Sequence, residues 1–107
     1  MVDRLNGYKP VEATASCTVS TGRDELVVIT TALLPDGFWC YGYYVVWLNT
    51  RSSLEHPSPD RGRFRSQRDA QLHCIGFFKH YLEFFTPENQ LAILDFEKSL
   101  AQKSLFD

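Results

Sequence analysis

The apolar segment at residues 37–48 dominates the hydrophobic pattern of the chain, and it holds both tryptophans and three of the five tyrosines. Aromatic and β-branched residues fit the pleated surface of a strand and lose side-chain freedom in a helix, so the segment predicts a strand. Alternation gives this strand an aromatic face that includes Trp39, Tyr41, Tyr43 and Trp47. The other face is apolar too, which indicates a central strand covered on both sides. An aromatic face left uncovered would instead be a docking or base-stacking platform.

Two further segments upstream have strand character. Residues 12–19 alternate weakly and predict a first strand at the edge of a sheet, and residues 25–34 are strongly β-branched and predict a second. Pro35, Asp36 and Gly37 then favour a tight hairpin, because proline pre-sets φ, aspartate tolerates the turn and glycine accepts a positive φ. The pattern therefore predicts a three-stranded antiparallel meander.

The segment at residues 49–65 is polar and rich in proline, so it predicts a long loop. Residues 66–69 resemble a capping box that opens a helix. Apolar residues then recur at helical spacing, namely Ala70, Cys74, Phe77, Phe78, Tyr81 and Phe85. Gly76 costs this helix about 1 kcal/mol relative to alanine, so we expect it to lie close against an aromatic ring of the sheet.

A second helix is predicted from about Pro87 to Ala101. Thr86 is a favourable N-cap, Pro87 suits the first helical position, and Glu88 complements the helix dipole. The order β-β-β-α-α predicts an α+β fold of two layers, in which a three-stranded antiparallel meander is followed by two helices. A chain of 107 residues is the size of one domain. We expect a single domain over residues 1–101 and a C-terminal tail over residues 102–107.

The formal net charge is −2, which argues against wholesale electrostatic binding of nucleic acid. One basic island nevertheless stands out in and after the predicted loop, formed by Arg51, Arg61, Arg63, Arg65 and Arg68. Residues 61, 63 and 65 alternate, so in an extended segment their side chains would project the same way. Together with the aromatic face they would form a surface for single-stranded nucleic acid. The alternative is a solvated loop with scattered ion pairs.

Candidate chemistry is sparse. The three cysteines are widely spaced and predict reduced thiols. His73 and His80 lie about 10 Å apart by helical rise, too far to share one metal ion. The sequence has no nucleophile signature and no phosphate-binding glycine loop, so we expect no enzyme, cofactor or metal. It has no signal-peptide pattern and no bilayer-length apolar run, so we expect a cytoplasmic protein without a membrane partner.

The chain ends in Gln102-Lys103-Ser104-Leu105-Phe106, followed by Asp107. This stretch resembles the short peptide by which bacterial proteins bind the DNA polymerase sliding clamp. That motif has Gln first, Ser or Asp third, and then Leu-Phe, so Gln102, Ser104, Leu105 and Phe106 match it. Lys103 departs from the Leu that the motif prefers. The resemblance implies an extended segment whose Leu-Phe pair fills an apolar pocket. The alternative is that Leu105 and Phe106 form the last turn of the core helix.

These observations favour a small non-enzymatic interaction protein, from a bacterial cytoplasm or its phages and plasmids. The leading hypothesis is a protein partner, with the sliding clamp first. A second hypothesis is a nucleic-acid-binding module that uses the arginines and the aromatic face. A third is a phage- or plasmid-encoded inhibitor of a host defence or nuclease complex. An uncovered aromatic face would most simply be buried in a homodimer.

Overall fold

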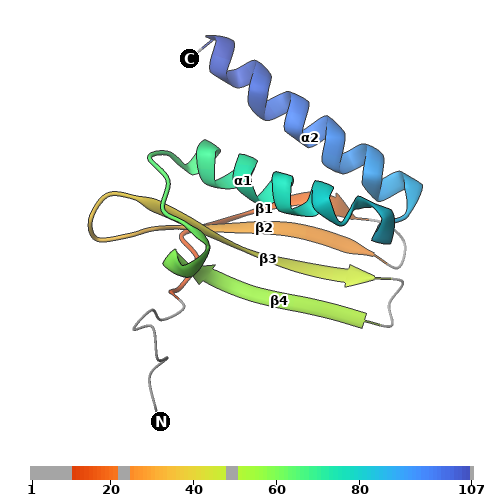
Figure 1. The fold of residues 1–107 in the computed structure, drawn as a ribbon, viewed down its shortest axis with the longest axis horizontal. Coiled ribbons are helices and arrows are strands. Elements are labelled where there is room, and N and C mark those ends of the chain that lie inside the picture. The colour runs from red at the N-terminus through yellow and green to blue at the C-terminus, as the bar shows by residue number, and fades with distance from the viewer. Residues whose placement is uncertain (1–10, 22–24, 48–50, 107) are drawn as a thin grey trace.

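The structure, a computed structural model, describes residues 11–21, 25–47 and 51–106; for residues 47, 51 and 103–106 it describes the backbone alone. Its sheet has the antiparallel order β1-β2-β3-β4, with strands β1 (Ala15–Thr21), β2 (Leu26–Leu33), β3 (Trp39–Trp47) and β4 (Arg51–Ser58) (Figure 1). The remaining elements are η1 (Pro59–Arg61), α1 (Gln67–His80), η2 (Leu82–Phe84) and α2 (Pro87–Phe106). The α+β class, with an antiparallel meander followed by two helices, is therefore confirmed.

The meander has four strands, because residues 51–58 form a strand where the sequence predicts a loop. The residues of β4 are mostly polar, and those whose side chains are described are largely exposed up to His56. An edge strand of this kind carries little hydrophobic signal. It forms because the backbone groups along the free edge of β3 need partners, and β4 supplies them in register from Trp47↔Arg51 onwards.

The hairpin between β2 and β3 has the predicted turn. The Leu34 amide donates to the Phe38 carbonyl over 2.7 Å, and the Gly37 amide donates to the Leu34 carbonyl over 2.9 Å. Gly37 has φ of 90°, in the region that favours glycine. The Asp36 carboxylate accepts the Phe38 amide over 3.0 Å, which explains why aspartate suits this turn.

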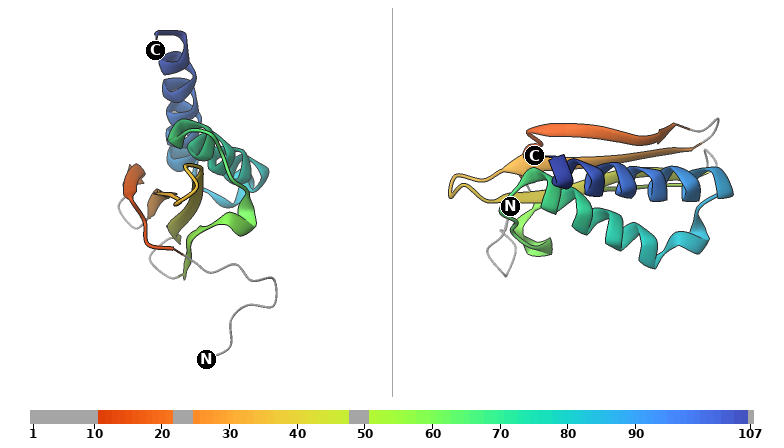
Figure 2. Two further views of the ribbon diagram at one scale, coloured as in Figure 1. Left: turned by 90° about the vertical axis from the view of Figure 1, so that its left-hand side faces the viewer. Right: turned by 90° about the horizontal axis from the view of Figure 1, so that it is seen from above.

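Both helices lie on one side of the sheet (Figures 1 and 2). Helix α1 crosses β2 and β3, whereas α2 packs against α1 and β1. The predicted N-cap of α1 is confirmed, since the Ser66 hydroxyl accepts the Asp69 amide over 3.0 Å. The main core lies between the two layers and includes the fully buried residues Val27, Ile29, Val45, Cys74, Ile75, Phe78 and Ile93.

Helix α1 is shorter than predicted and ends at His80 rather than Phe85. The chain turns through η2 so that Phe85, only 5% exposed, returns to the core with its ring 5.8 Å from that of Phe78. Helix α2 is longer than predicted and continues five residues beyond Ala101 to Phe106. The backbone of residues 102–106, predicted as a tail, is therefore the end of α2.

A buried polar cluster fixes the start of α2 against the end of the β1–β2 pair. The Glu25 carboxylate accepts the Thr86 hydroxyl over 2.7 Å and also the side-chain amide of Asn89. The Ser20 hydroxyl donates to the Asn89 side-chain oxygen, and the Thr86 hydroxyl caps the helix by accepting the Asn89 amide over 3.3 Å. A buried carboxylate is tolerated here because it accepts hydrogen bonds at the positive end of a helix dipole.

A β-bulge distorts β4 opposite Gly42. Tyr41 pairs with Ser58 and Tyr43 with Glu55, so His56 and Pro57 together face the single residue between them. The backbones approach so closely that a Cβ on Gly42 would lie 2.2 Å from the Glu55 carbonyl oxygen and 2.5 Å from the Pro57 nitrogen. Only glycine fits at this position.

Gly76 does not have the packing role that the sequence suggested. It is exposed on α1, and a Cβ there would meet nothing within 4 Å. The prediction of a close aromatic ring was wrong, because the core-facing side of the helix is formed by Cys74, Ile75 and Phe78 instead.

The two glycines predict opposite responses to the same substitution. Gly42→Ala should lower the free energy of unfolding by about 2 kcal/mol or more, because the added methyl group collides with backbone that cannot move aside. Gly76→Ala should raise it by about 0.5–1 kcal/mol through helix propensity. Urea unfolding of both variants beside the wild type measures the difference. Two changes of the same sign would contradict the register of β3 and β4.

Candidate interaction surfaces

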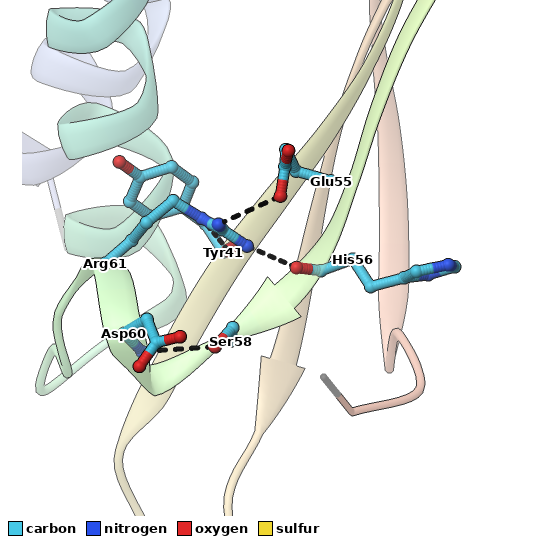
Figure 3. Close-up of polar contacts among 6 residues, drawn as sticks. All are labelled: Tyr41, Glu55, His56, Ser58, Asp60 and Arg61. Atoms are coloured by element: carbon cyan, nitrogen blue, oxygen red, sulfur yellow. Dashed lines mark hydrogen bonds and ion pairs between the residues drawn. The ribbon is translucent and has the colours of Figure 1, made fainter. Parts of the chain in front are cut away.

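Arg61, the first of the three alternating arginines, links β3 and β4 at the β-bulge, and we call this set of contacts the clip. Its Nε donates to the Tyr41 carbonyl over 3.3 Å, and its guanidinium also donates to the His56 carbonyl and to Glu55 over 3.3 Å (Figure 3). The guanidinium carbon lies 5.7 Å from the centre of the Tyr41 ring. One side chain thus binds both strands at the point where the bulge interrupts their ladder.

Arg63 is also engaged within the chain. It forms an ion pair with Asp36 of the β2–β3 hairpin, and its guanidinium carbon lies 5.2 Å from the centre of the Phe38 ring. Both members of the pair are about half exposed, so the contribution of the pair to stability is small. These contacts border a shallow hollow lined by Leu34, Pro35, Asp36, Pro59 and Arg63.

Two of the five arginines, Arg61 and Arg63, are therefore held by contacts within the chain. The alternation of residues 61, 63 and 65 does not align them, because Arg61 ends the short helix η1 and Gly62 follows with φ of 120°. Arg65 is exposed, Arg68 is half-buried at the start of α1, and only the backbone of Arg51 is described. The sequence alone could not tell whether Arg61 stabilises the fold or binds a ligand. The feature that decides this is the β-bulge, which exists only in the folded sheet.

The clip predicts that Arg61 acts on stability. Arg61→Ala should lower the free energy of unfolding by about 2 kcal/mol, because two backbone carbonyls lose a charged donor. Arg61→Lys should recover only part of this loss, since an ammonium group cannot match the planar fork. Arg65→Ala, at an exposed position four residues after Arg61, is the control and should change stability by less than about 0.5 kcal/mol. Equal effects at both positions in urea unfolding would contradict the assignment.

The predicted aromatic face lies beneath α1 and is not an open platform. Tyr41 is 3% exposed, and the ring of Tyr43 stacks on that of Phe77 at 5.2 Å. Trp39 is half-buried against the core, and only the backbone of Trp47 is described. The expectation of a covered strand is confirmed on this side. The use of Tyr41 and Tyr43 to stack bases is excluded in this arrangement, because the helix occupies the place that a base would take.

Burial raises the pKa of ionisable groups under the helix. The pKa of Tyr41 is raised to about 12 by burial. Burial also raises the pKa of the Cys40 and Cys74 thiols above their ordinary value of 9.0. All three cysteines are free, in agreement with the predicted reduced state. A raised pKa keeps the buried thiols protonated and disfavours the nucleophilic thiolate.

These shifts predict a loss of stability in alkali. The unfolded chain releases its thiol protons near the ordinary pKa of 9.0, whereas folded Cys74 retains its proton. The unfolded state therefore binds fewer protons above about pH 9. The contribution of these groups to the unfolding free energy is constant below that pH and falls as the pH rises towards the Tyr41 value of about 12. Urea unfolding over a pH series measures the slope. Cys74→Ala should make the fall shallower, and an unchanged slope would contradict the assignment.

The C-terminal motif occupies the free end of α2. Figure 1 and the left panel of Figure 2 show α2 diverging from the sheet, so that its C-terminal end stands clear of the strands. Leu100 is buried, and the next two residues, Ala101 and Gln102, are exposed. The backbone of Ser104, Leu105 and Phe106 is helical, and their side chains lie outside the described part of the structure. The motif therefore begins two residues after the buried Leu100.

A second candidate surface is the face of the sheet opposite the helices, which we call the uncovered face. The sequence predicted that β3 is covered on both sides, and on this side the residues that the structure describes supply cover at the hairpin end only. There Val11 packs on Ala32, Leu34 and Cys40. Beyond that end the side chains of Leu26, Val28, Tyr44, Val46 and Leu54 share this face. Period-two alternation identified these residues, but it could not tell a covered face from an open one.

An aromatic row also reaches the surface where α1 meets α2. Ring centres are 5.2 Å apart from Tyr43 to Phe77, 5.2 Å from Phe77 to Tyr81 and 6.3 Å from Tyr81 to Phe84. The row runs from the core to Phe84, which is 63% exposed. The sequence placed Tyr81 on the buried side of a longer helix, and it is instead partly exposed because α1 ends at the preceding residue.

The residues that the structure describes contain no group of three or more His, Cys, Asp or Glu side chains arranged to hold a metal ion. Within the same ranges, none of the helices has the length and apolar character needed to cross a membrane. Comparison with known proteins adds no relative, since no family model, no curated protein and no solved structure matches this chain.

Proposed function

We propose that this protein is a non-enzymatic protein-interaction module that presents the end of α2 to a groove on a partner, and that the bacterial sliding clamp is the first partner to test. The position of the motif at the free end of a helix carries the proposal. A binding peptide must be reachable by its partner, and α2 carries the backbone of residues 102–106 past the buried Leu100, at the end of the helix that diverges from the sheet.

The helical backbone of the motif is compatible with binding in an extended form. The last turn of a helix has carbonyl groups without intrahelical partners and frays at little cost. Residues 102–106 follow Leu100, so their unwinding would leave the buried side chains of Ile93 and Leu100 in place. The Leu-Phe pair would then enter an apolar pocket, and the Gln102 side chain would hydrogen-bond at its rim.

A protein partner fits the charges of the molecule better than a nucleic acid does. Two of the five arginines, Arg61 and Arg63, are engaged in contacts within the chain. Tyr41 and Tyr43 are covered by α1, and the formal net charge is −2. Binding to phosphates weakens steeply as salt rises, whereas docking of a Leu-Phe pair does not, so the salt dependence of binding separates the two.

The proposal predicts opposite effects of two substitutions within the motif. Phe106→Ala should weaken binding to a purified bacterial sliding clamp by about a hundredfold or more, because the anchor of the pocket is lost. Lys103→Leu should strengthen binding by several-fold, since it restores the residue that the motif prefers. Isothermal titration of the clamp with each full-length variant measures both effects.

Leu91→Ala supplies the matched control on the same helix. Leu91 is 64% exposed and lies well before the motif, so its loss should leave the affinity unchanged. A chain ending at Ala101 should not bind at all. Retention of clamp binding by that truncated chain, or by Phe106→Ala, would remove the motif from the mechanism. Absence of binding by the intact chain and by Lys103→Leu would exclude the clamp as the partner.

A further inference from the structure

The uncovered face has the layout of an interface, with an apolar centre and a polar border. Val28 pairs with Tyr44 and Tyr44 with Leu54, so these three form one row across three strands. Leu26 and Val46 form the next row, and Leu54 is 54% exposed. Hydroxyl and imidazole side chains surround this centre on the two edge strands, namely Ser16, Thr18, Thr21, Ser52 and His56. An apolar centre within a polar rim is the usual anatomy of a protein interface.

We propose that the uncovered face joins two copies of this protein, sheet against sheet, in a symmetric dimer. Charge is the first argument for a second copy. None of the strand residues that alternate onto this face is Lys, Arg, Asp or Glu. The face therefore offers no charges that would select a foreign partner, and two copies meet here without like-charge repulsion although each chain carries −2.

The area of the face is the second argument. Four strands spaced about 4.8 Å apart give the face a width of about 19 Å. Beyond Val11 the face has three rows of side chains, which begin at Thr30, Val28 and Leu26 of β2. Each row takes up two residues of strand, so the length is about 20 Å. Side chains corrugate this plane, so two copies together bury on the order of 1,000 Å², close to the lower limit for a specific interface. This area predicts a reversible dimer that dissociates on dilution.

Sheet geometry is the third argument. Two copies have the same twist, and sheets of matching twist pack face to face with their strands aligned within about 30° of each other. The result has four layers, with both helices of each copy on the outside, because α1 and α2 lie on the opposite side of the sheet (Figures 1 and 2). The C-terminal ends of α2 then remain clear of the dimer interface.

Two leucine substitutions of similar exposure test the dimer. Leu54→Glu puts a charge on the uncovered face, whereas Leu91→Glu puts the same charge on the outer helix α2, at positions that are 54% and 64% exposed. Sedimentation velocity over a concentration series should show a monomer–dimer equilibrium for the wild type. Leu54→Glu should weaken dimerisation by about tenfold or more, and Leu91→Glu should leave it unchanged. Circular dichroism checks that each variant is folded.

Several results would overturn the proposal. A wild type that stays monomeric at every concentration would show that the face is not self-associating. Equal weakening by both glutamates, or a dimer unaffected by Leu54→Glu and by the milder Leu54→Ser, would move the interface elsewhere. The chain ending at Ala101 should dimerise like the wild type, so failure of the dimer and failure of clamp binding are separate outcomes.

Discussion

The packing of α1 across the aromatic face of β3 is the contact on which the rest of the structure depends. Tyr43 meets both Phe77 and Phe78, at ring distances of 5.2 and 5.7 Å, and Tyr41 is almost completely buried beside them. Large aromatic surfaces removed from water dominate the stability of so small a core. Once both helices lie on this side, Val11 is the described residue outside the sheet that packs on the opposite face, at its hairpin end.

The β-bulge opposite Gly42 is the second constraint, and it explains why the arginines are arranged as they are. The extra residue in β4 interrupts the pairing of β3 with β4 between Tyr41 and Tyr43, and there the Arg61 guanidinium donates to the carbonyl groups of Tyr41 and His56. The short helix η1 holds Arg61 in reach of them. A basic residue in a polar segment can therefore serve the fold rather than a ligand. The remaining candidate surfaces are the end of α2 and the uncovered face.

Local signals in the sequence were dependable where short-range physics decides the structure. The turn at Pro35, Asp36 and Gly37 and the caps at Ser66 and Thr86 rest on hydrogen bonds between neighbours, and all are present. Strand β4 was missed because an edge strand with polar side chains has no hydrophobic alternation. The polar cluster of Glu25, Asn89 and Ser20 was also missed. Asn89 lies more than sixty residues after Ser20 and Glu25 in the sequence, so only folding brings it to them.

The sequence by itself determined the α+β class, the order of the first three strands and the two helices, the turn at residues 35–37 and the caps at Ser66 and Thr86. These follow from the spacing of residues along one chain and need no distant partner. Only the tertiary structure decided which face of β3 is covered and what Arg61 binds. Both faces of that strand are apolar, so alternation cannot show which of them the helices cover. The covered face is the one on which α1 packs, where Tyr43 stacks on Phe77.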